Sequence, residues 1–270
     1  MFRICFIFSI LILPVTSFLN AQQFSQTGED DFQAALQAEW KEVFFDPGSG
    51  DWQQKWFMDG ERGWVKNTSE GMVFSAGPIR GDDGSHAVLW TKEEFEGDVK
   101  IEFDYTRVDD IDYAVNILYI LATGKGEPPY TEDIAQWSHL RLVPHMSTYF
   151  RNMNLLHISF AAFPLKEGPQ SDYVRARRYP VKEGQKFGTD TRIAPDYFDT
   201  GLFLPGVSYH FTVIKQGEML FFQVKNEELS RLFQWNTSAF DPVHRGRIGI
   251  RHMYTRAARY SNVKISLIKE

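Results

Sequence analysis

The chain has 270 residues, of which 43% are hydrophobic, 15% aromatic and 24% charged. This composition is that of a globular protein long enough to bury a sizeable core, and it excludes low-complexity, collagen-like and disulfide-dense chains. The formal net charge of -6 argues against non-specific binding of nucleic acid, which needs clustered positive charge.

Residues 1–21 have the pattern of a secretory signal peptide. Arg3 supplies a positive charge, residues 4–15 are almost wholly apolar, and Ala21 is a small residue at the expected cleavage point. The apolar run is shorter than the roughly 20 residues that span a membrane. We therefore expect a secreted or periplasmic protein with no membrane span, the alternative being an uncleaved anchor. Cys5, the only cysteine, lies in this segment, so the mature chain has no disulfide.

Residues 22–41 are expected to form an N-terminal extension of the main domain. Within this extension, residues 32–41 carry apolar side chains at helical spacing, namely Phe32, Ala35, Leu36 and Trp40. This spacing predicts a short packing helix.

From residue 42 to residue 270 the hydrophobic period changes to two, with turn residues at short intervals. The expected strands lie at residues 43–45, 71–75, 86–90, 97–107, 113–121, 155–163, 207–215, 219–224, 246–253 and 262–268. In residues 97–107 the apolar side chains alternate with Lys100, Glu102 and Asp104, as in a half-buried strand. Many short strands without a long helix predict an all-β jelly-roll β-sandwich in a single domain.

Two long segments, residues 124–154 and 164–206, show no strand pattern. Structureless loops longer than about 15 residues are usually functional in a compact domain. Both segments are rich in Tyr, Arg and His, so we expect the functional site there.

An ordered set of motifs runs through the chain. In order they are Phe57-Met58-Asp59-Gly60, His86-Ala87-Val88-Leu89-Trp90, Asp98-Val99-Lys100-Ile101-Glu102-Phe103-Asp104, Met153-Asn154-Leu155-Leu156-His157-Ile158-Ser159-Phe160, Arg177-Arg178-Tyr179-Pro180, Gly246-Arg247-Ile248-Gly249-Ile250-Arg251-His252-Met253 and Ala258-Arg259-Tyr260-Ser261-Asn262-Val263. On these motifs the chain resembles the YesU-like family, long labelled a domain of unknown function, of the concanavalin A-like lectin/glucanase jelly-roll superfamily.

The resemblance covers residues 40–268 and implies both a fold and a substrate class. Family members tend to occur in bacterial carbohydrate-utilisation systems, including those for uronic-acid-containing polysaccharides. The implied ligands are therefore acidic oligo- or polysaccharides, such as ulvan or pectin-type polymers. An insert over residues 182–199 departs from the family pattern and is expected to reshape the cleft.

The predicted strand at residues 155–163 has one polar face. Alternation puts His157, Ser159 and Ala161 on this face and the larger apolar side chains on the other. Only one face of a sandwich strand packs in the core. We therefore expect the His157 face to line a concave sugar-binding surface.

The residue types near this strand suit β-elimination from a uronic acid. The reaction needs a base for the C5 proton, an acid for the leaving oxygen, and donors for the carboxylate on which charge builds. We assign His157 as the base, Tyr149 or Tyr254 as the acid, and Arg151 or Arg177 as the carboxylate clamp. A hydrogen-bonded structural histidine is the alternative for His157.

Five further residues are predicted to bind substrate: Asn154, Arg178, His86, Trp90 and Arg251. Arg178 belongs to a basic cluster in residues 175–192, and Arg251 to another in residues 245–259. If either cluster faces the cleft, it would steer an anionic sugar into place. A solvated arginine-rich loop is the alternative.

Two groups of acidic residues are alternative candidates for a functional site, one for glycoside hydrolysis and one for calcium binding. Glu102 and Asp104 match the first two positions of the Glu-x-Asp-x-x-Glu pattern of jelly-roll glucanases, but Arg107 stands at the third. Asp109, near the following turn, belongs to an acidic group that includes Asp110 and Asp112. We expect no required cofactor, and a structural calcium at this turn is the alternative to a solvated turn.

Three functions remain open for the predicted site. The leading hypothesis is a lyase or dehydratase that acts on uronic-acid-containing cell-wall glycans. The second is a glycoside hydrolase with a non-classical site, and the third is a non-catalytic carbohydrate-binding module. The sequence leaves the sugar, the linkage and the oligomeric state undetermined.

Overall fold

A computed structural model of the chain describes residues 28–165 and 171–269. The chain divides into two compact units, Met1–Gln37 and Ala38–Glu270. The described part of the first unit holds a helix at residues 28–36. The helix predicted at residues 32–41 therefore extends too far, because Trp40 and Lys41 pair with β16 and begin the first strand. The predicted signal peptide lies outside the described residues and stays a prediction.

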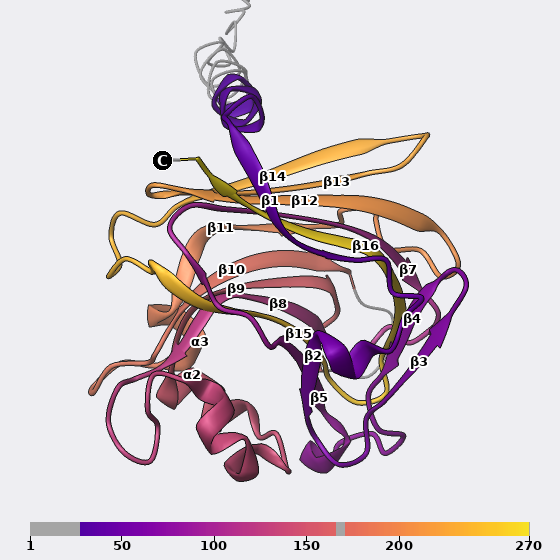
Figure 1. Ribbon diagram of the computed structural model, residues 1–270, viewed down its shortest axis with the longest axis vertical. Helices are drawn as coiled ribbons and strands as arrows, with labels where there is room; N and C mark the ends of the chain where they lie inside the picture. The colour runs from indigo at the N-terminus through magenta and orange to yellow at the C-terminus, as the bar shows by residue number, and fades with distance from the viewer. Residues whose placement is uncertain (1–27, 166–170, 270) are drawn as a thin grey trace, which may run out of the picture. The chain divides into compact units, whose positions relative to one another are not determined.

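The second unit is a sandwich of two eight-stranded antiparallel sheets (Figure 1). Sheet A consists of β1 (Trp40–Asp46), β3 (Trp64–Thr68), β4 (Gly71–Ser75), β7 (Val99–Arg107), β12 (Ser208–Gln216), β13 (Met219–Lys225), β14 (Ser230–Asn236) and β16 (Ala257–Ile268). Sheet B consists of β2 (Trp56–Asp59), β5 (Ala87–Thr91), β6 (Phe95–Glu96), β8 (Asn116–Gly124), β9 (Met153–Ala162), β10 (Tyr173–Tyr179), β11 (Arg192–Phe198) and β15 (Arg245–His252). The predicted all-β jelly-roll sandwich is confirmed.

Strand order follows from long antiparallel pairings rather than from neighbouring hairpins alone. Sheet A runs β14-β13-β12-β7-β16-β4-β3, with β1 beside β16. Sheet B runs β11-β10-β9-β8-β15-β5-β2, with β6 beside β15. The C-terminal strands β15 and β16 therefore lie within the two sheets. The short helices are η1 (Trp52–Gln54), η2 (Asp83–Ser85), η3 (Ile134–Arg141), α2 (Met146–Asn152) and α3 (Phe187–Asp190).

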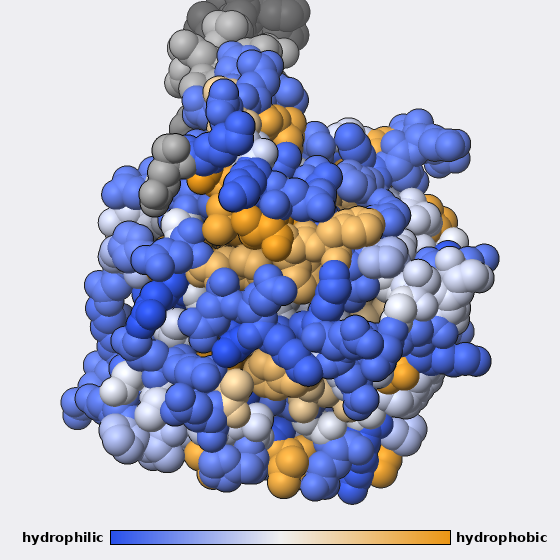
Figure 2. Space-filling view, viewed as in Figure 1, coloured by the Kyte–Doolittle hydropathy of each residue, from blue (hydrophilic) through white to orange (hydrophobic). Residues whose placement is uncertain are grey.

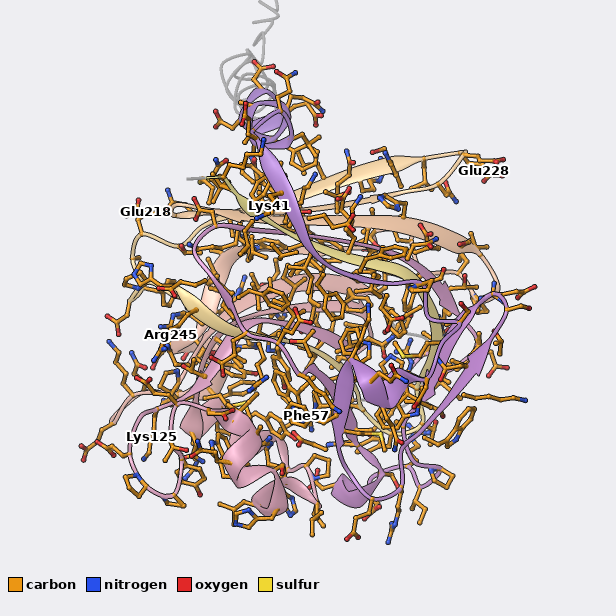
Figure 3. The ribbon with its side chains drawn as sticks, viewed as in Figure 1. Lys41, Phe57, Lys125, Glu218, Glu228 and Arg245 are labelled. Atoms are coloured by element: carbon orange, nitrogen blue, oxygen red, sulfur yellow. The ribbon has the colours of Figure 1, made fainter. Side chains whose placement is uncertain are left out.

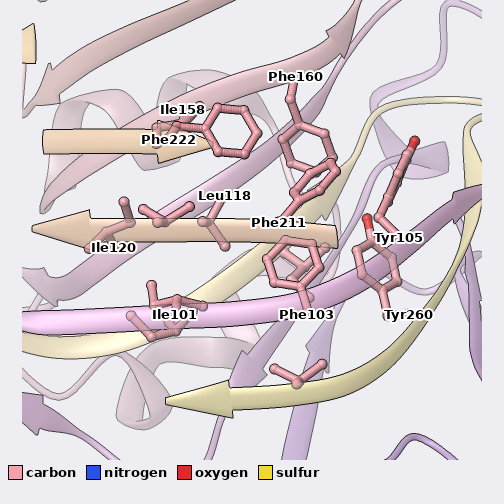
Figure 4. Packing of buried hydrophobic residues seen from close by; sticks show 14 of the residues in the cluster. Ile101, Phe103, Tyr105, Leu118, Ile120, Ile158, Phe160, Phe211, Phe222 and Tyr260 are labelled. Carbon is pink, nitrogen blue, oxygen red and sulfur yellow. The ribbon is translucent and has the colours of Figure 1, made fainter. Parts of the chain in front are cut away.

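The main core lies between the two sheets. In β7 the side chains predicted to face inward are at most 1% exposed, and they belong to this core. Figure 4 shows Phe103 and Tyr105 of β7 packed near Phe160 and Phe211. Burying each such side chain stabilises the fold by about 1.5–3 kcal/mol.

Several strands were not predicted, including β10 and β11 in the segment expected to be irregular. In β10 only Val174 and Ala176 face the core between the sheets. The intervening positions carry Arg175 and Arg177. A strand whose second face is built from arginine lacks the apolar run on which the prediction relied. The prediction of one long structureless loop at residues 164–206 is therefore wrong.

A bulge changes the predicted face of one residue in β9. His157 and Ser159 point away from sheet A, as expected, whereas Ala161 lies in the core between the sheets. Ala161 has a φ of 42°, and the register between β9 and β10 shifts beside it. The extra residue of the bulge reverses the alternation, so the expectation for Ala161 is wrong.

A third layer packs on the face of sheet B that points away from sheet A. It is formed by residues 125–152, here called the cover segment, which contains η3 and α2. Ile134, Trp137 and Tyr149 of this segment form a second core with side chains of sheet B, among them Trp90 and Tyr119. Figure 1 shows the three layers, with α2 on the far side of sheet B from sheet A. None of the helices in the described ranges is long and apolar enough to cross a membrane.

Candidate functional site

Asp59, at the end of β2, joins sheet B to the cover segment. Its Oδ2 accepts hydrogen bonds from Trp90 Nε1 at 2.7 Å, Arg141 Nε at 2.6 Å and Tyr149 OH at 2.9 Å. Trp90 belongs to β5, whereas Arg141 and Tyr149 belong to the cover segment. Removing a carboxylate from water is costly unless it is paired and hydrogen-bonded. This arrangement therefore ties the cover segment to the sheet.

Tyr149, one of the two predicted acids, is buried against aromatic rings of sheet B. Its ring is nearly parallel to those of Tyr119 and Trp90, with centroid distances of 5.9 Å and 6.5 Å. The guanidinium of Arg251 lies 4.5 Å from the centre of the same ring. Burial raises the pKa of Tyr149 well above its usual value. The phenol is therefore neutral, and in this conformation solvent does not reach it.

Arg251 and His86 meet beside Tyr149. Arg251 Nη2 donates to His86 Nδ1 at 2.7 Å and to the carbonyl oxygen of Pro144 at 2.6 Å. Because a guanidinium can only donate, the His86 proton resides on Nε2. Burial, assisted by the charge of Arg251, lowers the pKa of His86 to about 2. Tyr254, the second predicted acid, stacks on the His86 ring at a centroid distance of 4.7 Å.

His157 lies in the same buried layer and is only 2% exposed. Its Nδ1 is 2.7 Å from Tyr179 OH, and its Nε2 is 2.7 Å from Ser159 Oγ. Burial, with a contribution from Arg177, lowers the pKa of His157 well below its usual value. The imidazole is therefore neutral, and both nitrogens are engaged by hydroxyl groups. A substrate therefore does not reach it in this conformation.

Three other predicted residues link β10 to its neighbours. Arg177 Nη1 donates to the carbonyl oxygen of Phe187 at 2.8 Å. Arg178 Nε donates to the carbonyl oxygen of Asp241 at 2.7 Å, and its Nη2 donates to Asn154 Oδ1. Burial lowers the pKa of Arg178 to about 10. Arg178 and Asn154 are therefore together, but at the end of the sheet rather than beside His157.

Arg151, by contrast, is exposed on the outer side of α2. It borders a groove of about 540 Å³, here called the basic groove. The groove is lined by Lys125, Phe150, Arg151, Asn152, Val181, Lys182, Glu183, Gln185 and Phe187. Figure 3 labels Lys125, and in that part of the same view Figure 2 shows mostly hydrophilic side chains.

The basic groove has a net positive charge. Arg151, Lys125 and Lys182 face a single lining carboxylate, Glu183. Both lysines are paired with carboxylates outside the groove lining, Lys182 with Asp241 at 2.6 Å and Lys125 with Glu127 at 3.6 Å. Within the described residues, no carboxylate lies at ion-pair distance from Arg151. The groove thus offers an uncompensated guanidinium in a protein of negative net charge.

A stacked pair of phenylalanines forms one wall of this groove. Phe150 of α2 and Phe187 of α3 have ring centroids 4.4 Å apart. The guanidinium of Arg177 lies 4.5 Å from the centre of the Phe187 ring. The segment after β10, predicted as an insert that reshapes the cleft, is thereby fastened to α2.

Some residues of the site were not singled out from the sequence. They are Asp59, Tyr119, Arg141 and Tyr179. Asp59 and Tyr179 stood inside motifs of the family resemblance, which was the available signal. Tyr119 sits in a fully apolar run and Arg141 in a long loop, and neither position has a local pattern that indicates a site.

The predicted acidic alternatives lie elsewhere. Glu102 and Asp104 point outward from sheet A, since Phe103 between them faces the core. Glu102 pairs with Lys264 at 3.0 Å, and Asp104 Oδ1 is 2.8 Å from His210 Nδ1. These carboxylates are therefore on the opposite side of the sandwich from His157.

Asp109, in the acidic group considered for calcium, is held by arginines. It accepts from Arg107 Nε at 2.9 Å and from Arg256 Nε at 3.0 Å, and Asp112 also pairs with Arg107 at 3.0 Å. Among the side chains that the structure describes, no three His, Cys, Asp or Glu come together as metal ligands. A structural calcium at this turn stays a prediction.

The two sheets and their order define a concanavalin A-like lectin fold, and solved structures show the same fold. A protein of unknown function with a galectin-like fold from Bacillus subtilis matches with a TM-score of 0.58 and 18% identity, over 85% of this chain and 100% of that one. A legume lectin-like domain from Entamoeba histolytica gives 0.54 and 6%, over 85% and 99%. The exoplasmic/lumenal domain of VIP36, bound to Ca²⁺ and Man3GlcNAc, gives 0.50 and 12%, over 86% and 92%.

The family follows from the sequence match. Residues 48–265 match the model of the family described as a domain of unknown function, DUF1961. The match spans most of the chain, and the chain belongs to this family. The resemblance to the YesU-like family is thereby confirmed. No curated protein matches the chain.

Proposed function

We propose that this protein is exported and binds acidic, uronic-acid-containing glycans in the basic groove. The observation that carries the proposal is Arg151, an exposed guanidinium without an acidic partner within the described residues. Two lysines share the groove with it. The lectin-like fold, shared with carbohydrate-binding domains, supports sugar as the ligand class.

The chemistry of the groove favours a carboxylate-bearing ligand over a neutral one. A guanidinium forms two parallel hydrogen bonds to a carboxylate, and the charge strengthens both. The groove volume of about 540 Å³ is within the range of ligand pockets, about 300–1,000 Å³. Because the cations are solvent-exposed, salt screens their attraction for a carboxylate, with a Debye length of about 8 Å at physiological ionic strength. Binding should therefore decrease as salt is added.

The first test measures the affinity of the mature chain for polygalacturonate, ulvan and a neutral glucan. Arg151→Ala should weaken binding to the acidic polymers by about tenfold, the loss expected for one charge-assisted contact. Arg231→Ala on β14 is the matched control, because Arg231 is also exposed and lies on the other sheet. Equal effects of the two substitutions, or equal binding of the neutral glucan, would contradict the proposal.

β-Elimination is the second candidate, and one contact favours it. Tyr179 OH and His157 Nδ1 are 2.7 Å apart, so a hydroxyl acid and an imidazole base lie together. Arg251 is on the same face of sheet B. In this hypothesis the cover segment moves aside and His157 takes the C5 proton. The Tyr179 phenol donates a proton to the leaving oxygen.

The second test follows the ultraviolet absorbance of an unsaturated uronate while the protein is incubated with acidic polymers. A rise that is abolished by His157→Ala and kept by His244→Ala, an exposed histidine, would support elimination with His157 as base. A rise unchanged in both variants would sink the role of His157. New reducing ends without the chromophore would instead indicate a glycoside hydrolase, and binding without either product a binding module.

A further inference from the structure

Sheet B carries two stacked aromatic rings beneath the cover segment. The rings of Trp90 and Tyr119 lie 5.4 Å apart with an interplanar angle of 12°. Gly249 of β15 pairs with both residues. A Cβ built at Gly249 would lie only 2.3 Å from the Trp90 ring. The glycine therefore gives the Trp90 ring the space it occupies. These two rings are here called the aromatic floor.

Polar atoms without partners surround the aromatic floor. Within the described residues, Asp59 Oδ1 has no hydrogen-bond partner. Tyr119 OH and Nε and Nη1 of Arg251 lack a well-aligned hydrogen bond, although the Tyr119 and Arg251 side chains interact with each other. All three side chains are at most 2% exposed. Buried polar atoms are normally hydrogen-bonded, so this concentration at one place needs an explanation.

Of the two charged side chains beside the aromatic floor, Asp59 has an ionic partner and Arg251 has none within the described residues. Asp59 is paired with Arg141 at 2.6 Å. Arg251 is fully buried, and no carboxylate of the described chain lies at ion-pair distance from it. A buried cation of this kind favours an anionic partner. The missing partner is therefore expected to carry a carboxylate.

Tyr149 currently covers the floor, and its contacts resemble those of a bound sugar. Its ring is nearly parallel to both floor rings, at 9° and 13°. Its hydroxyl donates to Asp59 Oδ2. A flat ring on aromatic side chains, with a hydroxyl on a carboxylate, is also how a pyranose fits a protein site.

We propose that the aromatic floor is a uronate subsite and that Tyr149 is its intramolecular occupant. A uronic acid ring replaces the Tyr149 ring on Trp90 and Tyr119. One sugar hydroxyl takes the place of the phenol at Asp59, and the sugar carboxylate accepts from Arg251 and Tyr119. The ligand class rests on the proposed function, whereas the subsite rests on the buried polar atoms.

Exchange of Tyr149 for sugar requires α2 to move, and this helix is suited to it. α2 has seven residues and no side-chain hydrogen bond at its N-cap. It carries Tyr149 toward sheet B and Arg151 toward the basic groove. A glycan that engages Arg151 thus touches the element that has to move. The apparent affinity of the subsite is reduced by the fraction of molecules in which Tyr149 covers it.

The test uses free glucuronate as the probe, glucose as the neutral comparison, and calorimetric titration of the mature protein. Tyr149→Ala removes the occupant and should tighten the Kd for glucuronate by at least about tenfold, since closure no longer competes. Adding Arg251→Gln to Tyr149→Ala should abolish that gain. Tyr209→Ala, which opens space in the core between the sheets, is the matched control and should bind glucuronate no more tightly than the wild type.

Equal binding of glucose and glucuronate by Tyr149→Ala would overturn the proposal, as would the absence of any gain over the wild type. If Tyr149→Ala does not fold, Tyr149→Phe keeps the ring and removes the hydrogen bond to Asp59. A smaller gain in glucuronate affinity is then expected, and no gain overturns the proposal. Polymer binding that depends on Arg151 is measured separately, so the basic groove and the subsite can fail independently.

Discussion

At the level of single residues, Asp59 determines whether the cover segment stays on sheet B. It is the carboxylate that pairs with the fully buried Arg141, and it also accepts from Trp90 and Tyr149. Breaking a buried pair by removing one partner leaves an uncompensated charge, which costs about 3–5 kcal/mol. The pair holds a local arrangement together even where it adds little net stability over an apolar alternative.

Asp59→Asn should therefore lower the free energy of unfolding by about 3 kcal/mol or more, because the Arg141 guanidinium loses its counter-charge. Urea denaturation measures the change. Glu228→Gln, an exposed carboxylate in the β13–β14 turn, is the control and should stay within about 0.5 kcal/mol of the wild type. Equal midpoints for the two variants would show that Asp59 does not hold the cover segment.

At the level of elements, the alternation of side chains predicts strands where each face has one character. β7 is such a strand along most of its length: its apolar positions all face the core, whereas Lys100, Glu102 and Asp104 face outward. β10 lacks this contrast because arginines occupy its second face. The same alternation predicts the face of His157, but it does not predict that residues 125–152 fold over that face. Coverage depends on contacts between distant segments, which leave no local pattern.

The close approach of β15 to the aromatic floor gives a prediction for Gly249. Gly249→Ala places a Cβ 2.3 Å from the Trp90 ring, and that ring is fixed by its hydrogen bond to Asp59. Overpacking of this kind costs about 1–3 kcal/mol. We expect a lower urea midpoint together with a changed near-ultraviolet circular dichroism signal from Trp90.

Gly50→Ala is the comparison for Gly249→Ala, since a Cβ at Gly50 meets no atom within 4 Å. Its midpoint and its spectrum should match those of the wild type. If Gly249→Ala behaves in the same way, the Trp90 ring is free to move and the aromatic floor is not rigidly held.

At the level of the whole molecule, three buried histidines link the fold to pH. Burial, with a smaller effect of Arg256, lowers the pKa of His252 to about 3. The pKa of His86 is lowered to about 2, and that of His157 falls well below its usual value. All three imidazoles are therefore neutral in the folded protein near pH 5, whereas those of the unfolded chain take up protons below about pH 6.5.

The sign of the effect follows from proton binding. Because the unfolded state binds more protons, the stability from each histidine is fully present above the unfolded pKa and is lost as the pH falls. Between pH 7 and pH 5 each histidine should remove about 2 kcal/mol from the free energy of unfolding. The pKa of Asp109 is lowered overall: burial raises it, but the two arginines and the backbone N–H of Ala257 lower it by more. Asp109 therefore affects the free energy of unfolding only below about pH 4.

Urea midpoints measured between pH 7 and pH 5 should fall steadily, and His252→Gln should remove about a third of the fall. A midpoint that is constant from pH 7 to pH 5 would mean that these imidazoles gain protons without unfolding. Water would then have to reach the layer beneath the cover segment at His86 and His157, and the core side of sheet B at His252, which packs on Phe74.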